Sequence, residues 1–144
     1  MTIRRVDCNG NHRQGISVIS IDGLLIEDCR LRNTDGTAPR AGIDFEPNHP
    51  EDLLVSCVVR RCVAEFNAGT GYQICPQYLN GSSRPISIHL DRCVSRGNRQ
   101  HAIHLCSAQK DPPSGRLRIT RFLAENDGMA GLSVQFYPYD GVRV

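Results

Sequence analysis

Two carboxylates and a histidine are the residues of this chain best suited to acid–base chemistry. Asp44 and Glu46 are separated by a single residue, and His104 occupies the matching place in a later, similar stretch. Glycoside hydrolysis uses two carboxyl groups about 5–9.5 Å apart. Residues i and i+2 of a strand are about 6.7 Å apart at Cα. If both side chains lie on one face of a strand, the pair predicts cleavage of a sugar linkage.

The same residues would have other roles in a lyase or an epimerase. Asp44 or His104 would remove the proton next to a uronate carboxyl group, while Arg13 or Arg40 would neutralise that group. The substrate-binding residues that we predict are Arg13, Arg40, Gln73, His12, His101 and Tyr78. The competing interpretation is structural: the two carboxylates form a hydrogen-bonded surface pair before Pro47, and His104 is an ordinary surface histidine.

An internal repeat indicates which elements position these residues. A small residue, an aliphatic residue, any residue and a second aliphatic residue recur five times, usually after a turn residue. The small residues Gly15, Gly42, Gly71, Ala102 and Gly131 follow one another at intervals of 27, 29, 31 and 29 residues. A period in this range is typical of stacked units, none of which can bury its apolar face alone.

A second repeated pattern lies upstream of the first. It alternates an aliphatic, any residue and an aliphatic, and after two further residues reaches Cys or Phe. Its copies are Leu24-Ile26-Cys29, Cys57-Val59-Cys62, Ile88-Leu90-Cys93 and Leu117-Ile119-Phe122. The alternation is that of a strand, the two extra residues indicate a bend, and no window favours a long amphipathic helix. We therefore predict an all-β fold, a right-handed parallel β-helix (a single-stranded solenoid of about five coils) that forms one domain over residues 1–144.

Strand alternation then assigns side chains to faces. The two aliphatic residues of the first pattern point inward, so the residue between them points outward. This predicts an outward row about 4.8 Å apart from coil to coil, the Asp44 row, made of Ser17, Asp44, Gln73, His104 and Ser133. The next outward row, the Glu46 row, contains Glu46, Cys75, Cys106 and Gln135. Loops rich in Pro, Gly and Ser at 35–40, 47–52, 76–84 and 107–114 could border a groove along this face.

Outward residues at the bend differ in character from the Asp44 row. Their charges alternate from coil to coil in two rows, Glu27, Arg60 and Asp91, then Asp28, Arg61, Arg92 and Arg121. Alternating signs indicate mutual charge satisfaction on a solvated face. We therefore predict that the face carrying the Asp44 row contains the functional site.

Composition limits the partners. The net charge is +2, and of 17 basic residues only Lys110 is a lysine. No basic stripe with interspersed aromatics exists, so nucleic acid is not the expected partner. No apolar run approaches ~20 residues and no signal peptide is visible in the chain, so we predict no membrane partner and leave the compartment open.

The seven cysteines do not suggest a disulfide framework. Cys29, Cys62 and Cys93 occupy equivalent positions in successive units, where they would be buried as small hydrophobes. No cysteine or histidine pair has metal-ligand spacing, so we expect no bound transition metal.

From about residue 11 to residue 136, the chain resembles right-handed parallel β-helix proteins of the pectate-lyase-like superfamily, including β-helix repeat proteins of bacteria and phages. The resemblance rests on the repeats from Asn11 through Asn48. It implies a polysaccharide partner that is cleaved, epimerised or bound, and a secreted, phage or cell-surface location. Pectate lyases bind calcium through outward acidic residues. Asp44 and Glu46 could do so, but two carboxylates are too few for the six to eight oxygens that calcium takes, so our expectation is no cofactor.

Two narrower resemblances fit less of the chain. The tetrapeptide Asn33-Thr34-Asp35-Gly36 resembles a motif of polygalacturonases, but the Asp-Asp pair, Gly-His-Gly and Arg-x-Lys of that family are absent. The stretch around Asp44 and Pro47 resembles the Asp-Pro-His region of alginate epimerases, with His49 offset from the matching place. The tetrapeptide is also simply a good turn sequence.

A non-catalytic role is the alternative from another class: a glycan-binding or structural β-helix, such as a phage tail or cell-surface adhesin segment. Tyr78, Tyr137 and Tyr139 are its candidate sugar-stacking residues. The sequence patterns leave the first and last coils without recognisable caps, and exposed apolar rows and free edges promote association. We therefore expect a segment of a longer β-helix, with further coils at either end, or a homo-oligomer.

Overall fold

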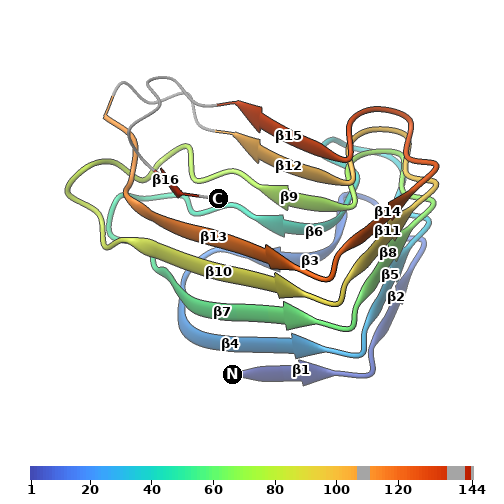
Figure 1. Ribbon diagram of the computed structural model, residues 1–144, viewed down its shortest axis with the longest axis horizontal. Coiled ribbons are helices and arrows are strands. Elements are labelled where there is room, and N and C mark those ends of the chain that lie inside the picture. Colours follow the sequence, from blue (N-terminus) through green and yellow to red (C-terminus); the bar gives the residue numbers. More distant parts are fainter. Residues whose placement is uncertain (107–110, 136–141, 144) are drawn as a thin grey trace.

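The computed structural model describes residues 1–106, 111–135 and 142–143, and these form strands, bends and turns without a helix. The strands build three parallel sheets that wind into a β-solenoid of about four turns (Figure 1). The all-β parallel solenoid predicted from the repeats is confirmed. We expected about five coils. The number of turns is lower because five copies of the repeated pattern are separated by only four intervals, each of which is one turn.

Each coil contributes one strand to each sheet in turn. Sheet A contains β1 (Thr2–Arg4), β4 (Ile21–Glu27), β7 (Leu54–Arg60), β10 (Ile86–Asp91), β13 (Gly115–Thr120) and β16 (Val142–Arg143). Sheet B contains β2 (Asp7–Asn9), β5 (Arg30–Arg32), β8 (Val63–Glu65), β11 (Val94–Arg96) and β14 (Leu123–Glu125). Sheet C contains β3 (Gln14–Val18), β6 (Ala41–Phe45), β9 (Tyr72–Ile74), β12 (Ile103–Cys106) and β15 (Leu132–Gln135).

Left-handed residues make the bends between sheets A and B. Five equivalent positions along the solenoid have φ between 52° and 56°: Arg5, Asp28, Arg61, Arg92 and Arg121. These are the bends predicted by the two extra residues before each Cys or Phe. A second set of left-handed residues ends each strand of sheet B, at Gly10, Asn33, Phe66, Gly97 and Asn126. Gly and Asn tolerate this conformation readily, whereas Phe66 is an unusual residue there.

The small residue at the start of each sheet C strand has a steric cause. A Cβ built on Gly42 would lie 2.7 Å from the carbonyl oxygen of Gly71 and 2.9 Å from the Cβ of Ala64. A Cβ on Gly71 would lie 2.5 Å from Ser95 Oγ. Sheets B and C meet closely here, so the repeated glycines mark a tight corner of the coil.

Aliphatic side chains fill the interior in rows. Ile43 and Phe45 of β6 are fully buried, as are Ile74 and Leu105 in the coils that follow. Tyr72 replaces an aliphatic residue and donates its hydroxyl hydrogen to the carbonyl oxygen of Cys62 at 2.8 Å. The inward orientation predicted for the aliphatic residues is confirmed.

A buried polar ladder runs along the corner between sheets B and C. Asn67 Nδ2 donates to Asn98 Oδ1 at 2.8 Å, and Asn98 Nδ2 donates to Asp127 Oδ1 at 2.9 Å. The same amides also donate to the carbonyl oxygens of Leu31 and Ala64 in the coils below. The turn residues of the repeat therefore satisfy backbone groups that the tight corner buries.

The charged rows at the bend pair as the sequence predicts. Arg61 contacts both Asp28 and Glu27, and Arg121 contacts Asp91 at 2.7 Å. These pairs link neighbouring coils, and their arginines are 42% and 60% exposed, so each contributes little to stability alone.

The last coil leaves its apolar residues open. Leu132 and Val134, which continue the inward rows of sheet C, are 45% and 41% exposed. Whether further coils or a second chain cover them stays a prediction. None of the described residues belongs to a helix of the length and apolarity that a membrane crossing requires.

Candidate functional site

The predicted Asp44 row exists as one continuous line across sheet C. Ser17 pairs in register with Asp44, and Asp44 pairs with Gln73. Gln73 then pairs with His104, and His104 with Ser133. Parallel in-register strands therefore bring together five residues that lie far apart in the sequence, in the order that the repeat predicts.

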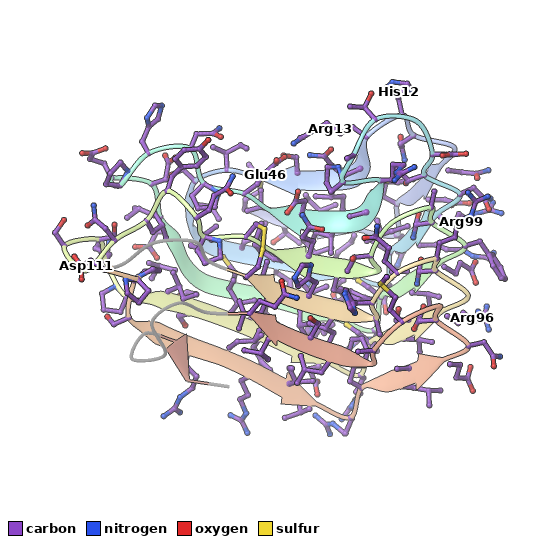
Figure 2. All side chains as sticks on the ribbon, turned by 90° about the horizontal axis from the view of Figure 1, so that it is seen from above. His12, Arg13, Glu46, Arg96, Arg99 and Asp111 are labelled. Atoms are coloured by element: carbon purple, nitrogen blue, oxygen red, sulfur yellow. A yellow bond between two sulfur atoms is a disulfide. The ribbon has the colours of Figure 1, made fainter. Side chains whose placement is uncertain are left out.

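Glu46 lies just beyond the end of β6 and is held by the coil below. Both of its carboxylate oxygens accept hydrogen bonds from the Arg13 guanidinium, at 2.8 and 2.7 Å. Ser17 and Gln14 also donate to its Oε1. Figure 2 shows Arg13 and Glu46 on the same edge of the molecule, away from Arg96 and Arg99. Burial raises the pKa of Glu46, but the hydrogen bonds from Arg13, Ser17 and Gln14 outweigh it, so the net pKa is lowered.

Asp44 has the opposite environment, although it lies only two residues away. Its side chain is on the outward row, yet the residue is only 2% exposed. Its Oδ1 is buried and has no hydrogen-bond partner among the described residues. Burial, together with the negative charge of Glu46, raises the pKa of Asp44 from 3.8 to about 7, against the opposing charge of Arg13. We predicted an outward position; the burial was not predicted.

The two carboxyl groups therefore differ in protonation near neutral pH. Glu46 is ionised and neutralised by Arg13, while Asp44 is close to its midpoint and can accept or release a proton. Adjacent titratable groups whose pKa values are driven apart are a feature of sites that perform acid–base chemistry.

His104 follows Asp44 along the same row, with Gln73 between them. Burial lowers the pKa of His104, a hydrogen bond with Gln135 opposes this, and the nearby His101 adds to the lowering. The two imidazole rings have centroids 5.0 Å apart. His104 is thus biased toward its neutral form, which is the form that accepts a proton.

The other predicted binding residues are spread over the rim of this face. His12 contacts the hydroxyl of Thr37 through Nε2 at 2.9 Å. Arg40 immediately precedes β6, and its Nε is buried without a hydrogen-bond partner among the described residues. Tyr78 is 50% exposed in the loop after β9, while Tyr137 and Tyr139 lie outside the described residues. Within the described part of the chain, no hydrogen bond or ion pair joins His12, Arg40 or Tyr78 to Asp44. The site residues that the structure brings together are Arg13, Asp44 and Glu46, with Gln73 and His104 on the same row.

One feature of the face was missed at the sequence level. Cys75 and Cys106, neighbours on the Glu46 row, are joined by a disulfide with Cα atoms 5.1 Å apart. The expectation that the cysteines are not joined in disulfides is wrong for this pair. The available signal was that both residues fall on an outward row one coil apart, whereas Cys29, Cys62 and Cys93 fall on an inward row.

The donor set of this face does not resemble a calcium site. The oxygens of Glu46 are already occupied by Arg13, Ser17 and Gln14, which leaves Asp44 as the only free carboxylate of the pair. Within the described residues, no group of three or more His, Cys, Asp or Glu side chains converges at metal-ligand distances.

Comparison with known proteins gives no relative. The chain matches no family model, no curated protein and no solved structure.

Proposed function

We propose that this β-helix acts on a polysaccharide bound along the outward face of sheet C, as a lyase or epimerase of the pectate-lyase-like kind. The observation that supports this most strongly is the buried carboxyl group of Asp44, whose pKa is raised to about 7 beside an ionised Glu46. A group with its pKa near the working pH is efficient at moving protons.

Proton transfer at a uronate fits the site better than hydrolysis does. A glycosidase needs a second carboxylate that is free to act as nucleophile or base. Glu46 is a poor candidate for the nucleophile or base, because Arg13 donates hydrogen bonds to both of its oxygens. Ser17 and Gln14 donate further hydrogen bonds to Oε1. Glu46 instead acts on Asp44, since its negative charge helps to raise the pKa of Asp44.

The proposed roles follow from these positions. Asp44 removes the proton next to the uronate carboxyl group, and neutral His104, two coils further along the row, serves as the second proton-transfer group. Arg40 makes no ion pair among the described residues, so it can neutralise the substrate carboxylate. Gln73, His12, His101 and Tyr78 would bind sugar units to either side, with Arg13 holding Glu46. The general β-helix fold alone does not imply this chemistry.

The test is turnover by Asp44→Asn on a panel of uronans and neutral glycans. On a substrate that the wild type converts, we expect Asp44→Asn to lower turnover by about 10²–10⁴-fold, the usual contribution of a general base. Wild-type turnover should rise as the pH passes through about 7 and level off above it, because the base must be deprotonated. Asp22→Asn, an exposed carboxyl change on sheet A, is the matched control. Unchanged turnover in Asp44→Asn would exclude the proposed role.

A non-catalytic glycan-binding or structural β-helix is the second candidate. The observation in its favour is the 2% exposure of Asp44, since a substrate must reach this carboxyl group to exchange a proton with it. Glycan binding without any product, in both the wild type and Asp44→Asn, would select this function. Absence of binding to every glycan would favour a structural role alone.

A further inference from the structure

The cysteines fall into two populations with different surroundings. Five are free and face the interior, where their thiols mostly donate to backbone carbonyl oxygens: Cys8, Cys29, Cys57, Cys62 and Cys93. The last four are at most 1% exposed. Burial also raises the pKa of Cys57 to about 12, which keeps its thiol protonated and unreactive.

Cys75 and Cys106 form the outward population. Cys106 is the last residue of β12, and Cys75 follows directly after β9. The register pairs Ile74 with Leu105, so the two cysteines are the next pair along the strands. Their Cα atoms are 5.1 Å apart, within the range of about 4.4–6.8 Å that a disulfide spans. The bond can therefore form or break with the strands in place.

Accessibility separates this pair from Cys29, Cys57, Cys62 and Cys93, whereas Cys8 is itself partly exposed. Both cysteines are partly exposed on the outward face of sheet C. The amide of Gln73 lies 3.8 Å from Cys75 Sγ, and the backbone N–H of Cys75 donates to the carbonyl oxygen of Phe45 in the coil below. Thiol–disulfide exchange requires access for an attacking thiolate, and the partly exposed outward sulfurs of Cys75 and Cys106 offer that without unfolding.

We propose that Cys75 and Cys106 are a thiol-modification site: a reversible dithiol–disulfide pair that exchanges with low-molecular-weight disulfides in the folded protein. In oxidation, the thiolate of one cysteine attacks the small disulfide and displaces one thiolate, which takes up a proton. The second cysteine, as its thiolate, then attacks the mixed disulfide and releases a second small thiol. Two protein thiols are oxidised to one disulfide and one small disulfide is reduced to two thiols, so protons and electrons balance.

Oxidation has a mechanical consequence for the solenoid. The bond closes a loop with a sequence separation of 31 residues and covalently joins two neighbouring coils within the Glu46 row. Without the bond, backbone hydrogen bonds and packing alone hold β9 to β12. The oxidised protein should therefore melt at a higher temperature than the reduced protein, by about 5–10 °C. This inference does not depend on the proposed function.

The experiment incubates the folded full chain in mixtures of reduced and oxidised glutathione, followed by alkylation and peptide mass spectrometry. We expect the peptides of Cys75 and Cys106 to change from two alkylated thiols to one linked pair as the mixture becomes oxidising, and back on reversal. The buried thiols of Cys29, Cys57, Cys62 and Cys93 should be alkylated only after denaturation. A pair that stays reduced in oxidised glutathione, or stays linked in reduced glutathione, overturns the proposal, as does preferential modification of an inward cysteine.

Thermal melting of variants gives a second, independent measurement. The difference in Tm between oxidised and reduced protein should vanish in Cys106→Ser and persist in the matched control Cys8→Ser. Cys75→Ser serves the same purpose if Cys106→Ser does not fold. A difference that survives in either variant of the pair would assign the redox effect to other cysteines and refute the inference.

Discussion

Glu65 on sheet B and Asp44 on sheet C have nearly the same burial and opposite electrostatics. Glu65 is 0% exposed and Asp44 is 2% exposed. Arg30 from the coil below and Arg96 from the coil above both contact Glu65. Burial raises the pKa of Glu65, but these two arginines outweigh it and the net pKa is lowered. The residues in register with Asp44 are the uncharged Ser17 and Gln73, and the pKa of Asp44 is raised to about 7.

The difference shows that burial raises the pKa of an outward carboxyl group unless neighbours in adjacent coils supply arginines that outweigh it. In a parallel solenoid, register fixes which residues those neighbours are. The rest of the charged rows follow the pattern of Glu65: Glu27, Asp28 and Asp91 each have arginine partners, and each has a lowered pKa. Asp44 departs from this pattern, which marks it as the residue least explained by a structural role.

The largest effect is expected from Asp44→Asn on stability. The folded pKa of Asp44 lies above its ordinary value of 3.8, so its protonated form stabilises the fold below about pH 4, and that stability is lost as the pH rises through about 7. The amide removes the cost of a buried charge. We expect the variant to equal the wild type near pH 4 and to exceed its free energy of unfolding by about 2–4 kcal/mol at pH 8.

Denaturant unfolding at several pH values checks this prediction. Asp22→Asn, an exposed carboxyl change on sheet A, should shift stability by less than about 0.5 kcal/mol at each pH. A stability difference for Asp44→Asn that does not grow with pH would show that the two carboxylates do not differ as described.

Glu65→Gln is expected to act in the opposite direction. The lowered pKa of Glu65 means that its charge stabilises the fold above its ordinary value of 4.5, and that this stability is lost as the pH falls. Loss of the two arginine contacts should cost about 1–3 kcal/mol at pH 7, since a buried charge-assisted network is broken while Arg30 and Arg96 keep access to water. Denaturant unfolding at pH 7 and pH 3 measures this loss of stability. A Glu65→Gln variant more stable than the wild type would contradict the difference described between Glu65 and Asp44.

The sequence predicts the strands and their register well, because both depend on the spacing of residues in the repeat. Alternation within each pattern sets the strands, and the 27–31-residue interval sets the register, so the alignment of Ser17, Asp44 and Gln73 follows from counting. The bends were located by the same means, although their left-handed conformation was not.

The ionisation of the site carboxyl groups depends on side-chain contacts that residue spacing does not predict. The sequence predicted Arg13 and Arg40 as substrate-binding residues, and only the structure shows that Arg13 binds Glu46 and leaves Asp44 Oδ1 without a hydrogen-bond partner among the described residues. The Cys75–Cys106 bond was missed for a different reason. The repeat places both residues at neighbouring outward positions, but the odd number of cysteines and the inward positions of Cys29, Cys62 and Cys93 argue against disulfides at the level of the sequence.

A carbon-13 NMR titration of the Asp44 carboxyl group, assigned by comparison with Asp44→Asn, tests the central claim most directly. We predict a midpoint near pH 7 in the wild type. In Glu46→Gln we expect a midpoint lower by about one unit, because the neighbouring negative charge is removed. A wild-type midpoint near the ordinary value of 3.8 would contradict the claim that Asp44 exchanges its proton at neutral pH.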